Sequence, residues 1–142
     1  CAFDPLLEDF YLRLLQRRMA LAAECELVQG EQLIVLRYLP GERYLPHRDY
    51  LSPRVLAANR PDAGQRMRTV CVYLNTVTGG GDTDFPLLNQ RVDPKAGQAV
   101  VFDNLTPDGV ADPDSLHAGL EVTEGEKWLA TLWVRQGRYR AF

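Results

Sequence analysis

The chain has 142 residues, 46% of them hydrophobic, which is enough for one domain that buries its own core. Its formal net charge is −3, whereas domains that bind nucleic acid usually carry a basic excess, and no stretch approaches the roughly 20 apolar residues of a membrane span. The 3 cysteines are widely spaced and form no CxxC pair, which argues against a disulfide framework and a zinc ribbon. The composition thus predicts neither nucleic acid nor a membrane as partner, and the sparse cysteines favour a cytoplasmic location.

An amphipathic helix is predicted near the N-terminus, from Asp4 to Glu24. Asp4 is a typical N-cap residue, and Pro5 suits the first helical position because the N–H that it lacks would be unpaired there. The apolar residues that follow recur at helical spacing, namely Leu6, Leu7, Phe10, Leu14, Leu15, Met19 and Ala22. We expect this helix to lie with its apolar face on a sheet, and no second helix of similar strength follows it.

Strands are predicted from residue 32 onward. Short apolar runs bounded by turn signals cover residues 33–38, 43–50, 70–74, 99–102, 116–122 and 127–135, and the last two read as a hairpin. The three glycines at 79–81 indicate a bend rather than a phosphate loop, because no Lys-Ser/Thr pair follows them. Six or seven short strands with one flanking helix predict a mainly β fold, a sandwich or jelly roll. The loops at 52–66 and 103–115 are candidate covers for a site.

His47, Asp49 and His117 are candidate metal ligands. On a strand, residues i and i+2 point to the same face, so His47 and Asp49 would present an imidazole and a carboxylate side by side. With His117 from a later strand they would complete the two-histidine, one-carboxylate set of non-haem Fe(II) oxygenases. The alternative is a pair of ordinary histidines, because acids are frequent enough in this chain to follow a histidine by chance.

Lys127 is a candidate binding residue for an anion. It lies ten residues after His117 at the start of a predicted strand. A cation inside a β-barrel needs an anionic partner, because an unpaired buried charge is costly. A dicarboxylate bound to the metal at one end would supply that partner at the other. The alternative is a solvated lysine paired with Glu124 or Glu126, an interaction that stabilises little.

The sequence resembles the catalytic domain of prolyl 4-hydroxylases, in the Fe(II)- and 2-oxoglutarate-dependent dioxygenase family. The resemblance runs from about Leu33 to Arg135. Its pieces are residues 35–38, 44–49, 64–67, 73–75 and 94–97, Gly-Gly-Asp-Thr-Asp-Phe-Pro at 80–86, Ser-Leu-His-Ala-Gly at 115–119, and Gly-Glu-Lys-Trp at 125–128 with Trp133 after it. Their order and spacing together are far more specific than the metal triad alone.

The resemblance implies a role for each matching residue. The iron ligands would be His47, Asp49 and His117, and Lys127 would bind the distal carboxylate of 2-oxoglutarate. Further positions that line the co-substrate pocket in related enzymes are Tyr38, Tyr73, Thr83 and Trp133. Tyr44 and Arg66 match positions that contact the target peptide in related enzymes. Plain packing within the sheet is the alternative for the pocket residues, and a solvated loop cation is the alternative for Arg66.

The fold that the resemblance implies is the double-stranded β-helix, a jelly roll with one flanking helix. We expect residues 1–142 to form a dioxygenase catalytic domain without the N-terminal part of the family's domain. The implied activity is hydroxylation of a prolyl residue in a peptide or protein, with molecular oxygen as co-substrate, decarboxylation of 2-oxoglutarate to succinate, and L-ascorbate as reductant. Two alternatives stay open: a non-catalytic metal-binding β-sandwich, and the same chemistry on a small molecule.

Overall fold

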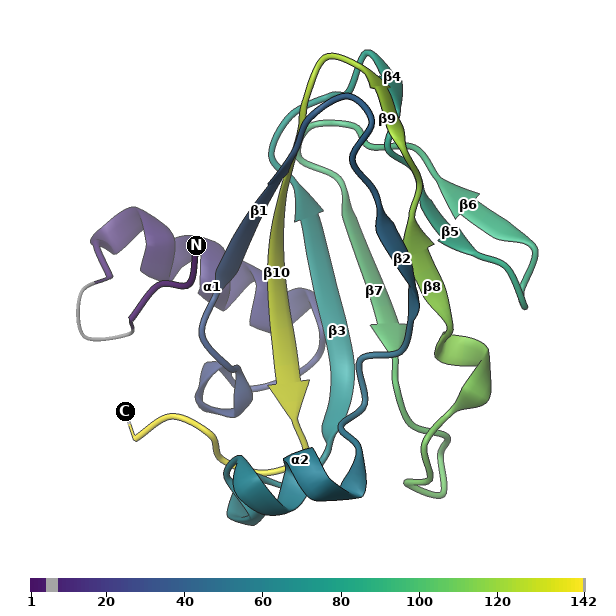
Figure 1. Ribbon diagram of the computed structural model, residues 1–142. Helices are drawn as coiled ribbons and strands as arrows, with labels where there is room; N and C mark the ends of the chain where they lie inside the picture. Colours follow the sequence, from purple (N-terminus) through teal and green to yellow (C-terminus); the bar gives the residue numbers. More distant parts are fainter. Residues whose placement is uncertain (5–7, 142) are drawn as a thin grey trace.

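The computed structural model describes residues 1–4 and 8–141 and shows two antiparallel sheets that face each other (Figure 1). One sheet has the strand order β1 (Ile34–Tyr38), β10 (Lys127–Arg135), β3 (Arg66–Tyr73) and β7 (Ala99–Asp103). The other has the order β2 (Tyr44–His47), β8 (His117–Gly119), β5 (Thr83–Phe85) and β6 (Gln90–Val92). A short pair, β4 (Gly79–Gly80) with β9 (Val122–Glu124), lies at one end. The predicted mainly β jelly roll is therefore confirmed.

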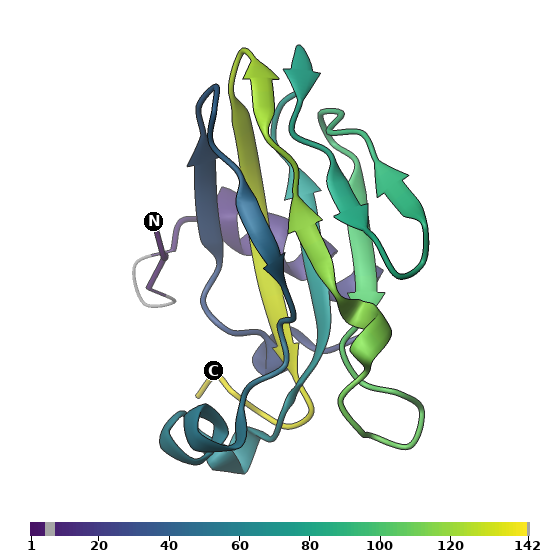
Figure 2. The ribbon, with the colours of Figure 1, turned by 45° about the vertical axis from the view of Figure 1, so that its right-hand side comes forward.

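The helix α1 (Phe10–Ala22) covers the outer face of the first sheet, against β3 and β10 (Figures 1 and 2). Its buried Met19 packs with Leu33, Val70 and Leu132 in the main apolar core. The helix is shorter than the predicted 4–24, because the side chain of Asp9 accepts from the Leu12 N–H and caps it. Residues 5–7 lie outside the described part, so the predicted start at Pro5 is not placed.

The predicted hairpin between 116–122 and 127–135 is wrong. The turn before Lys127 exists, with Gly125 at φ 78°, but the segments that it joins belong to different sheets. The strand β8 pairs with β2 and β5, β9 pairs with β4, and β10 pairs with β1 and β3. A turn signal predicts a reversal of the chain, whereas the pairing partners are set by long-range packing.

The segment predicted as a loop at 52–66 contains a short helix, α2 (Pro53–Ala58), and a 3-10 turn, η2 (Pro61–Ala63). The hydroxyl of Ser52 accepts from the Val55 N–H and caps α2. Two further 3-10 turns are η1 (Leu27–Gln29) and, at the end of the predicted loop 103–115, η3 (Pro113–Ser115). Both predicted loops thus carry structure of their own.

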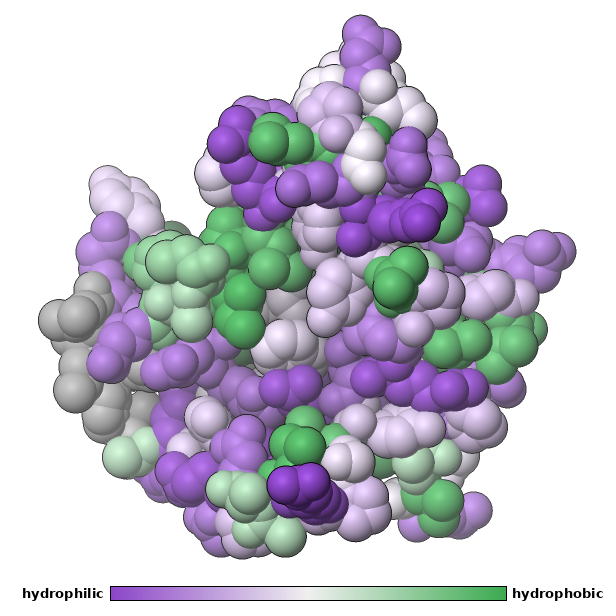
Figure 3. Space-filling view, viewed as in Figure 1, coloured by the Kyte–Doolittle hydropathy of each residue, from purple (hydrophilic) through white to green (hydrophobic). Residues whose placement is uncertain are grey.

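Apolar and polar side chains are interspersed on the face shown in Figure 3, where the apolar ones form separate patches. Within the described residues, every helix is too short or too polar to traverse a lipid bilayer.

Candidate metal centre and co-substrate cavity

The three predicted metal ligands meet between the sheets. His47 is the last residue of β2, His117 is the first residue of β8, and the strand register places them directly opposite each other. The Nε2 of His47 lies 3.6 Å from Asp49 Oδ1, and the Nε2 of His117 lies 3.7 Å from Asp49 Oδ2. One ligand atom from each residue lies within 4.8 Å of the others, which suits a shared metal ion.

Backbone carbonyls orient both imidazole rings. The Nδ1 of His47 hydrogen-bonds to the Leu45 carbonyl at 2.8 Å, and the Nδ1 of His117 to the Ser115 carbonyl at 2.9 Å. A carbonyl can only accept, so each Nδ1 carries the hydrogen and each Nε2 keeps a lone pair for a metal. This arrangement is typical of metal-bound histidines, whose second nitrogen is held by a neighbouring acceptor.

The protonation states also suit a cation. Burial lowers the pKa of His117, more than the nearby Asp49 charge raises it, which favours the neutral ligand form. Burial raises the pKa of Asp49, but the polar groups around the carboxyl outweigh it and leave the pKa below its usual range; they are the imidazoles of His47 and His117, the Thr69 hydroxyl and the Trp133 indole. Asp49 is therefore an ionised carboxylate that is buried, with 6% of its surface exposed.

Lys127 opens β10 in the facing sheet and points into the same cavity. Its Nζ donates to the Gly81 carbonyl at 2.6 Å, while the rings of Tyr38 and Tyr73 lie 5.7 and 5.4 Å away. Within residues 1–4 and 8–141, no carboxylate forms an ion pair with this ammonium group. Burial lowers the pKa of Lys127 to about 8. A buried ammonium group with one of its three N–H bonds paired can bind an incoming carboxylate through the donors that remain.

The cavity between the sheets has a volume of about 270 Å³ and contains the metal ligands and Lys127 in its wall. Tyr38, Thr83 and Trp133, three of the predicted co-substrate residues, line it as well. The fourth, Tyr73, is fully buried behind the wall, where its hydroxyl donates to Thr83 Oγ1 at 2.7 Å. The indole N–H of Trp133 is buried and forms no hydrogen bond of normal geometry in the described part of the chain, although it lies near enough to the Asp49 carboxyl to lower its pKa. The cavity thus offers unused donors to a carboxylate ligand.

The sequence reasoning missed several residues of the cavity wall. Cys71 and Thr131 contact each other there, Sγ to Oγ1, at 3.6 Å, and the apolar wall is made by Ile34, Leu36 and Leu129. Strand alternation carries the signal that would have found them: Leu129 and Thr131 share a face of β10 with Lys127. Burial raises the pKa of Cys71 to about 12, so its thiol stays neutral.

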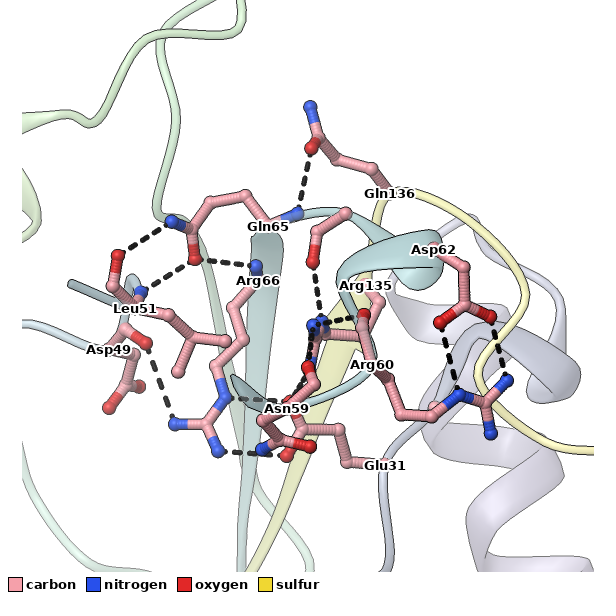
Figure 4. Close-up of polar contacts among 12 residues, drawn as sticks. Glu31, Asp49, Leu51, Asn59, Arg60, Asp62, Gln65, Arg66, Arg135 and Gln136 are labelled. Carbon is pink, nitrogen blue, oxygen red and sulfur yellow. Dashed lines mark hydrogen bonds and ion pairs between the residues drawn. The ribbon is translucent and has the colours of Figure 1, made fainter. Parts of the chain in front are cut away.

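The two residues predicted to contact a peptide, Tyr44 and Arg66, lie beside the cavity. Tyr44 lines its rim, is 47% exposed, and places its ring 4.1 Å from that of His47. Arg66 donates to both carboxylate oxygens of Glu31 at 2.8 Å (Figure 4). Its guanidinium group lies 3.9 Å from the ring centre of Trp133. Their role toward a peptide stays a prediction.

The same Glu31 carboxylate binds Arg135, a fully buried residue at the end of β10 (Figure 4). Arg135 also donates to the backbone carbonyls of Asn59, Arg60 and Gly64 at 2.8–3.1 Å. These bonds fasten the segment after α2 to the first sheet, next to the cavity.

We expect Arg135→Met to destabilise the fold by about 3 kcal/mol, because it leaves three backbone carbonyls unpaired and removes half of the positive charge around Glu31. The free energy of unfolding in urea measures this loss. Arg138→Met is the matched control, since Arg138 is an exposed arginine of the same tail that bonds only to tail carbonyls. A loss of under 1 kcal/mol for Arg135→Met would show that the network does not stabilise the fold.

A family model of the 2OG-Fe(II) oxygenase superfamily matches residues 33–135, which is most of the chain. The chain belongs to this superfamily. The match begins just before β1 and ends with β10, so it contains all the metal-ligand candidates and Lys127 of this oxygenase domain.

Relatives and solved structures agree with the assignment. The chain is 37% identical over 138 residues to prolyl 4-hydroxylase 1 of Arabidopsis thaliana, covering 88% of this chain and 48% of that protein. It is 44% identical over 113 residues to a putative prolyl 4-hydroxylase of Acanthamoeba polyphaga mimivirus, covering 78% and 47%. A viral collagen prolyl hydroxylase from Paramecium Bursaria Chlorella virus-1, solved as a 2OG complex, superposes with a TM-score of 0.75 at 30% identity, covering 95% and 77%. The chain therefore spans about half the length of the curated relatives that it matches.

Proposed function

We propose that residues 1–142 form the catalytic part of an Fe(II)- and 2-oxoglutarate-dependent dioxygenase that hydroxylates prolyl residues in a peptide or protein. The observation that carries the proposal is one cavity with a His–Asp–His cluster and a buried ammonium group that has no carboxylate partner among the described residues. The reaction would convert the substrate C–H, oxygen and 2-oxoglutarate to the alcohol, succinate and carbon dioxide.

The donor set fits iron, since two neutral imidazoles and one carboxylate on one side of an ion leave positions open opposite them. Nε2 of His47, Nε2 of His117 and the Asp49 carboxylate would hold the metal. Bound iron with its 2-oxo acid supplies the oxidising power of the reaction. The protein itself contributes charge balance, orientation and a cavity with an apolar wall.

Lys127 would bind the distal carboxylate of 2-oxoglutarate. The Gly81 carbonyl accepts one of its three N–H bonds, which aims the ammonium group and leaves the other donors for the ligand. Tyr38, Thr83 and Trp133 would complete the pocket, with Tyr73 holding Thr83 from behind. A co-substrate that is bound at both ends is held in one orientation. The reaction is then faster, because the reacting groups are already in position.

A prolyl substrate is supported by the relatives, which carry the name prolyl 4-hydroxylase, and by the aromatic rim at Tyr44 beside the metal ligands. Arg66, next to Trp133, would contact the peptide from the other side. A small-molecule substrate and a non-catalytic metal-binding role are the alternatives that an activity assay separates.

The test is succinate formation with Fe(II), 2-oxoglutarate, L-ascorbate and a panel of proline-containing peptides, with each proline replaced by alanine as control. We expect peptide-dependent succinate formation and a mass gain of one oxygen on proline. Succinate without peptide hydroxylation would point to a different substrate. If the metal-loaded protein does not turn over 2-oxoglutarate, the proposed enzymatic function is contradicted.

The affinity for 2-oxoglutarate should fall as the pH rises above about 8. The ligand carboxylate binds the protonated ammonium group, so above the pKa of Lys127 in the free protein, about 8, binding must take up a proton. The dissociation constant then rises by up to about tenfold per pH unit and is flat below pH 8. Calorimetric titration of the Mn(II)-loaded protein measures it, with Lys127→Arg as control, because a guanidinium group stays charged. Equal slopes for both proteins would contradict this assignment.

A further inference from the structure

Behind the metal-ligand cluster, a buried chain of hydrogen bonds runs away from Asp49 into the facing sheet. The Thr69 hydroxyl donates to Asp49 Oδ2 at 2.7 Å, and the Asn104 side-chain amide donates to the same Thr69 oxygen at 2.8 Å. Thr69 and Asn104 are both fully buried. Neither has a place in the sequence-based hypothesis or in the cavity wall.

The direction of this chain is fixed by chemistry. An ionised carboxylate can only accept, and the amide nitrogen of Asn104 can only donate. The Thr69 hydroxyl therefore receives one hydrogen bond and must give its own hydrogen to Asp49. Asn104 thereby holds the hydroxyl in the rotamer that faces the ligand.

The hydrogen bond from Thr69 also makes the two carboxylate oxygens of Asp49 unequal. Oδ2 accepts the Thr69 hydroxyl at 2.7 Å and faces the Nε2 of His117 at 3.7 Å, whereas Oδ1 faces the Nε2 of His47 at 3.6 Å. A carboxylate with one oxygen already bonded offers a cation the other one, because the bonded oxygen has given up part of its basicity. One metal–oxygen bond instead of two keeps an additional position on the ion free.

Backbone contacts hold Asn104 itself in place. It follows β7, its N–H donates to the Met67 carbonyl at 2.8 Å, and its own carbonyl accepts from the Asp112 N–H at 2.9 Å. The side-chain oxygen of Asn104 has no hydrogen-bond partner among the described residues. The hydrogen bond from its side-chain nitrogen to Thr69 is therefore the polar contact that this side chain makes there.

We propose that Thr69 and Asn104 are positioning residues that hold Asp49 as a one-oxygen metal ligand. The inference rests on the proposed metal site. It goes beyond that site because it assigns which oxygen binds the ion and which residues outside the ligand set decide it.

The test is Co(II) binding to the metal-free protein, followed by the d–d absorption of the bound ion. We expect Thr69→Val, which keeps the shape and removes the hydroxyl, to lower the affinity for Co(II) by about 10- to 100-fold and to change the d–d intensity, because Oδ2 becomes free to coordinate. Thr69→Ser, which restores the hydroxyl, should recover both readouts.

Asn104→Leu should give a smaller loss, about three- to tenfold, and no additional loss in the Thr69→Val background, because Asn104 acts through Thr69. Val70→Ala is the matched control: Val70 is the next residue of β3, fully buried on the opposite face, so it lowers stability without altering Co(II) affinity or spectrum.

Wild-type protein that does not bind Co(II) at this cluster would contradict the proposed function. Wild-type protein that binds, together with Thr69→Val and Asn104→Leu proteins of unchanged affinity and spectrum, would overturn the positioning role alone. If Thr69→Val does not fold, the Asn104→Leu and Thr69→Ser proteins decide the question by the same two readouts.

Discussion

Lys127→Met should bind 2-oxoglutarate at least 100-fold more weakly than the wild-type protein and should also be more stable without it. The loss of affinity follows because the substitution removes the charge that would pair with a buried carboxylate. The gain in stability follows from the pKa of about 8, since an unfolded lysine titrates near 10.5. Keeping this group charged in the folded protein costs about 3 kcal/mol below pH 8, at 1.36 kcal/mol per pKa unit.

The pH dependence gives this prediction a second readout. Between pH 8 and 10.5 the unfolded wild-type chain binds more protons than the folded one, so the stability of the wild type rises with pH. The advantage of Lys127→Met, measured by unfolding in urea, should therefore shrink over this range. Lys95→Met is the matched control, since Lys95 is an exposed lysine paired with Asp93, and it should change neither quantity. A Lys127→Met protein with wild-type affinity would remove the main support for the proposed function.

His117→Ala should abolish metal binding at the cluster, with the affinity for Zn(II) or Co(II) reduced by at least 100-fold. The imidazole supplies one of three metal ligands, and the two ligands that remain are too few to bind the ion tightly. Metal should also raise the melting temperature of the wild-type protein, because it would bind the folded chain, and this increase should vanish in the variant. Differential scanning fluorimetry with and without metal measures it.

Arg48→Ala is the matched control for His117→Ala. Arg48 lies between His47 and Asp49 in sequence, but it turns away from the cavity and donates to the Pro113 carbonyl. We expect its metal affinity to stay within about threefold of wild type, since surface substitutions change free energies by about 0.5 kcal/mol. Equal losses in both variants would mean that the effect is on folding rather than ligation.

The jelly roll, and the cluster of His47, Asp49 and His117, could be predicted from the sequence because their signals are local or carried by motifs. The run from Lys127 to Arg135 is of this kind. The strand predicted at 43–50 is only partly correct, because β2 ends at His47 and Asp49 lies two residues beyond it, outside any strand. The strand β5 and its partner β6 are three residues each, too short for periodicity to identify. The pairing of β10 with β1 and β3, in place of a hairpin with the preceding strand, depends on packing between distant segments.

Besides the wall residues named above, the parts of the site that were not predicted are a backbone carbonyl and the residues behind the metal ligands. The Gly81 carbonyl reaches Lys127 because Gly81 adopts φ 76°, a left-handed conformation that no side-chain pattern reveals. Thr69 and Asn104 are separated by 35 residues and meet only through the pairing of β3 with β7. Helix α1 could be predicted, but its start at Phe10 could not, because the cap is Asp9 and not Asp4.

A crystal structure of the protein with Mn(II) and a non-reacting analogue of 2-oxoglutarate tests the central claim most directly. We predict one ion bonded to Nε2 of His47, Nε2 of His117 and Oδ1 of Asp49, with the two ends of the analogue on the ion and on Lys127 Nζ. An ion bound elsewhere, or an analogue whose distal carboxylate lies away from Lys127, would contradict the account.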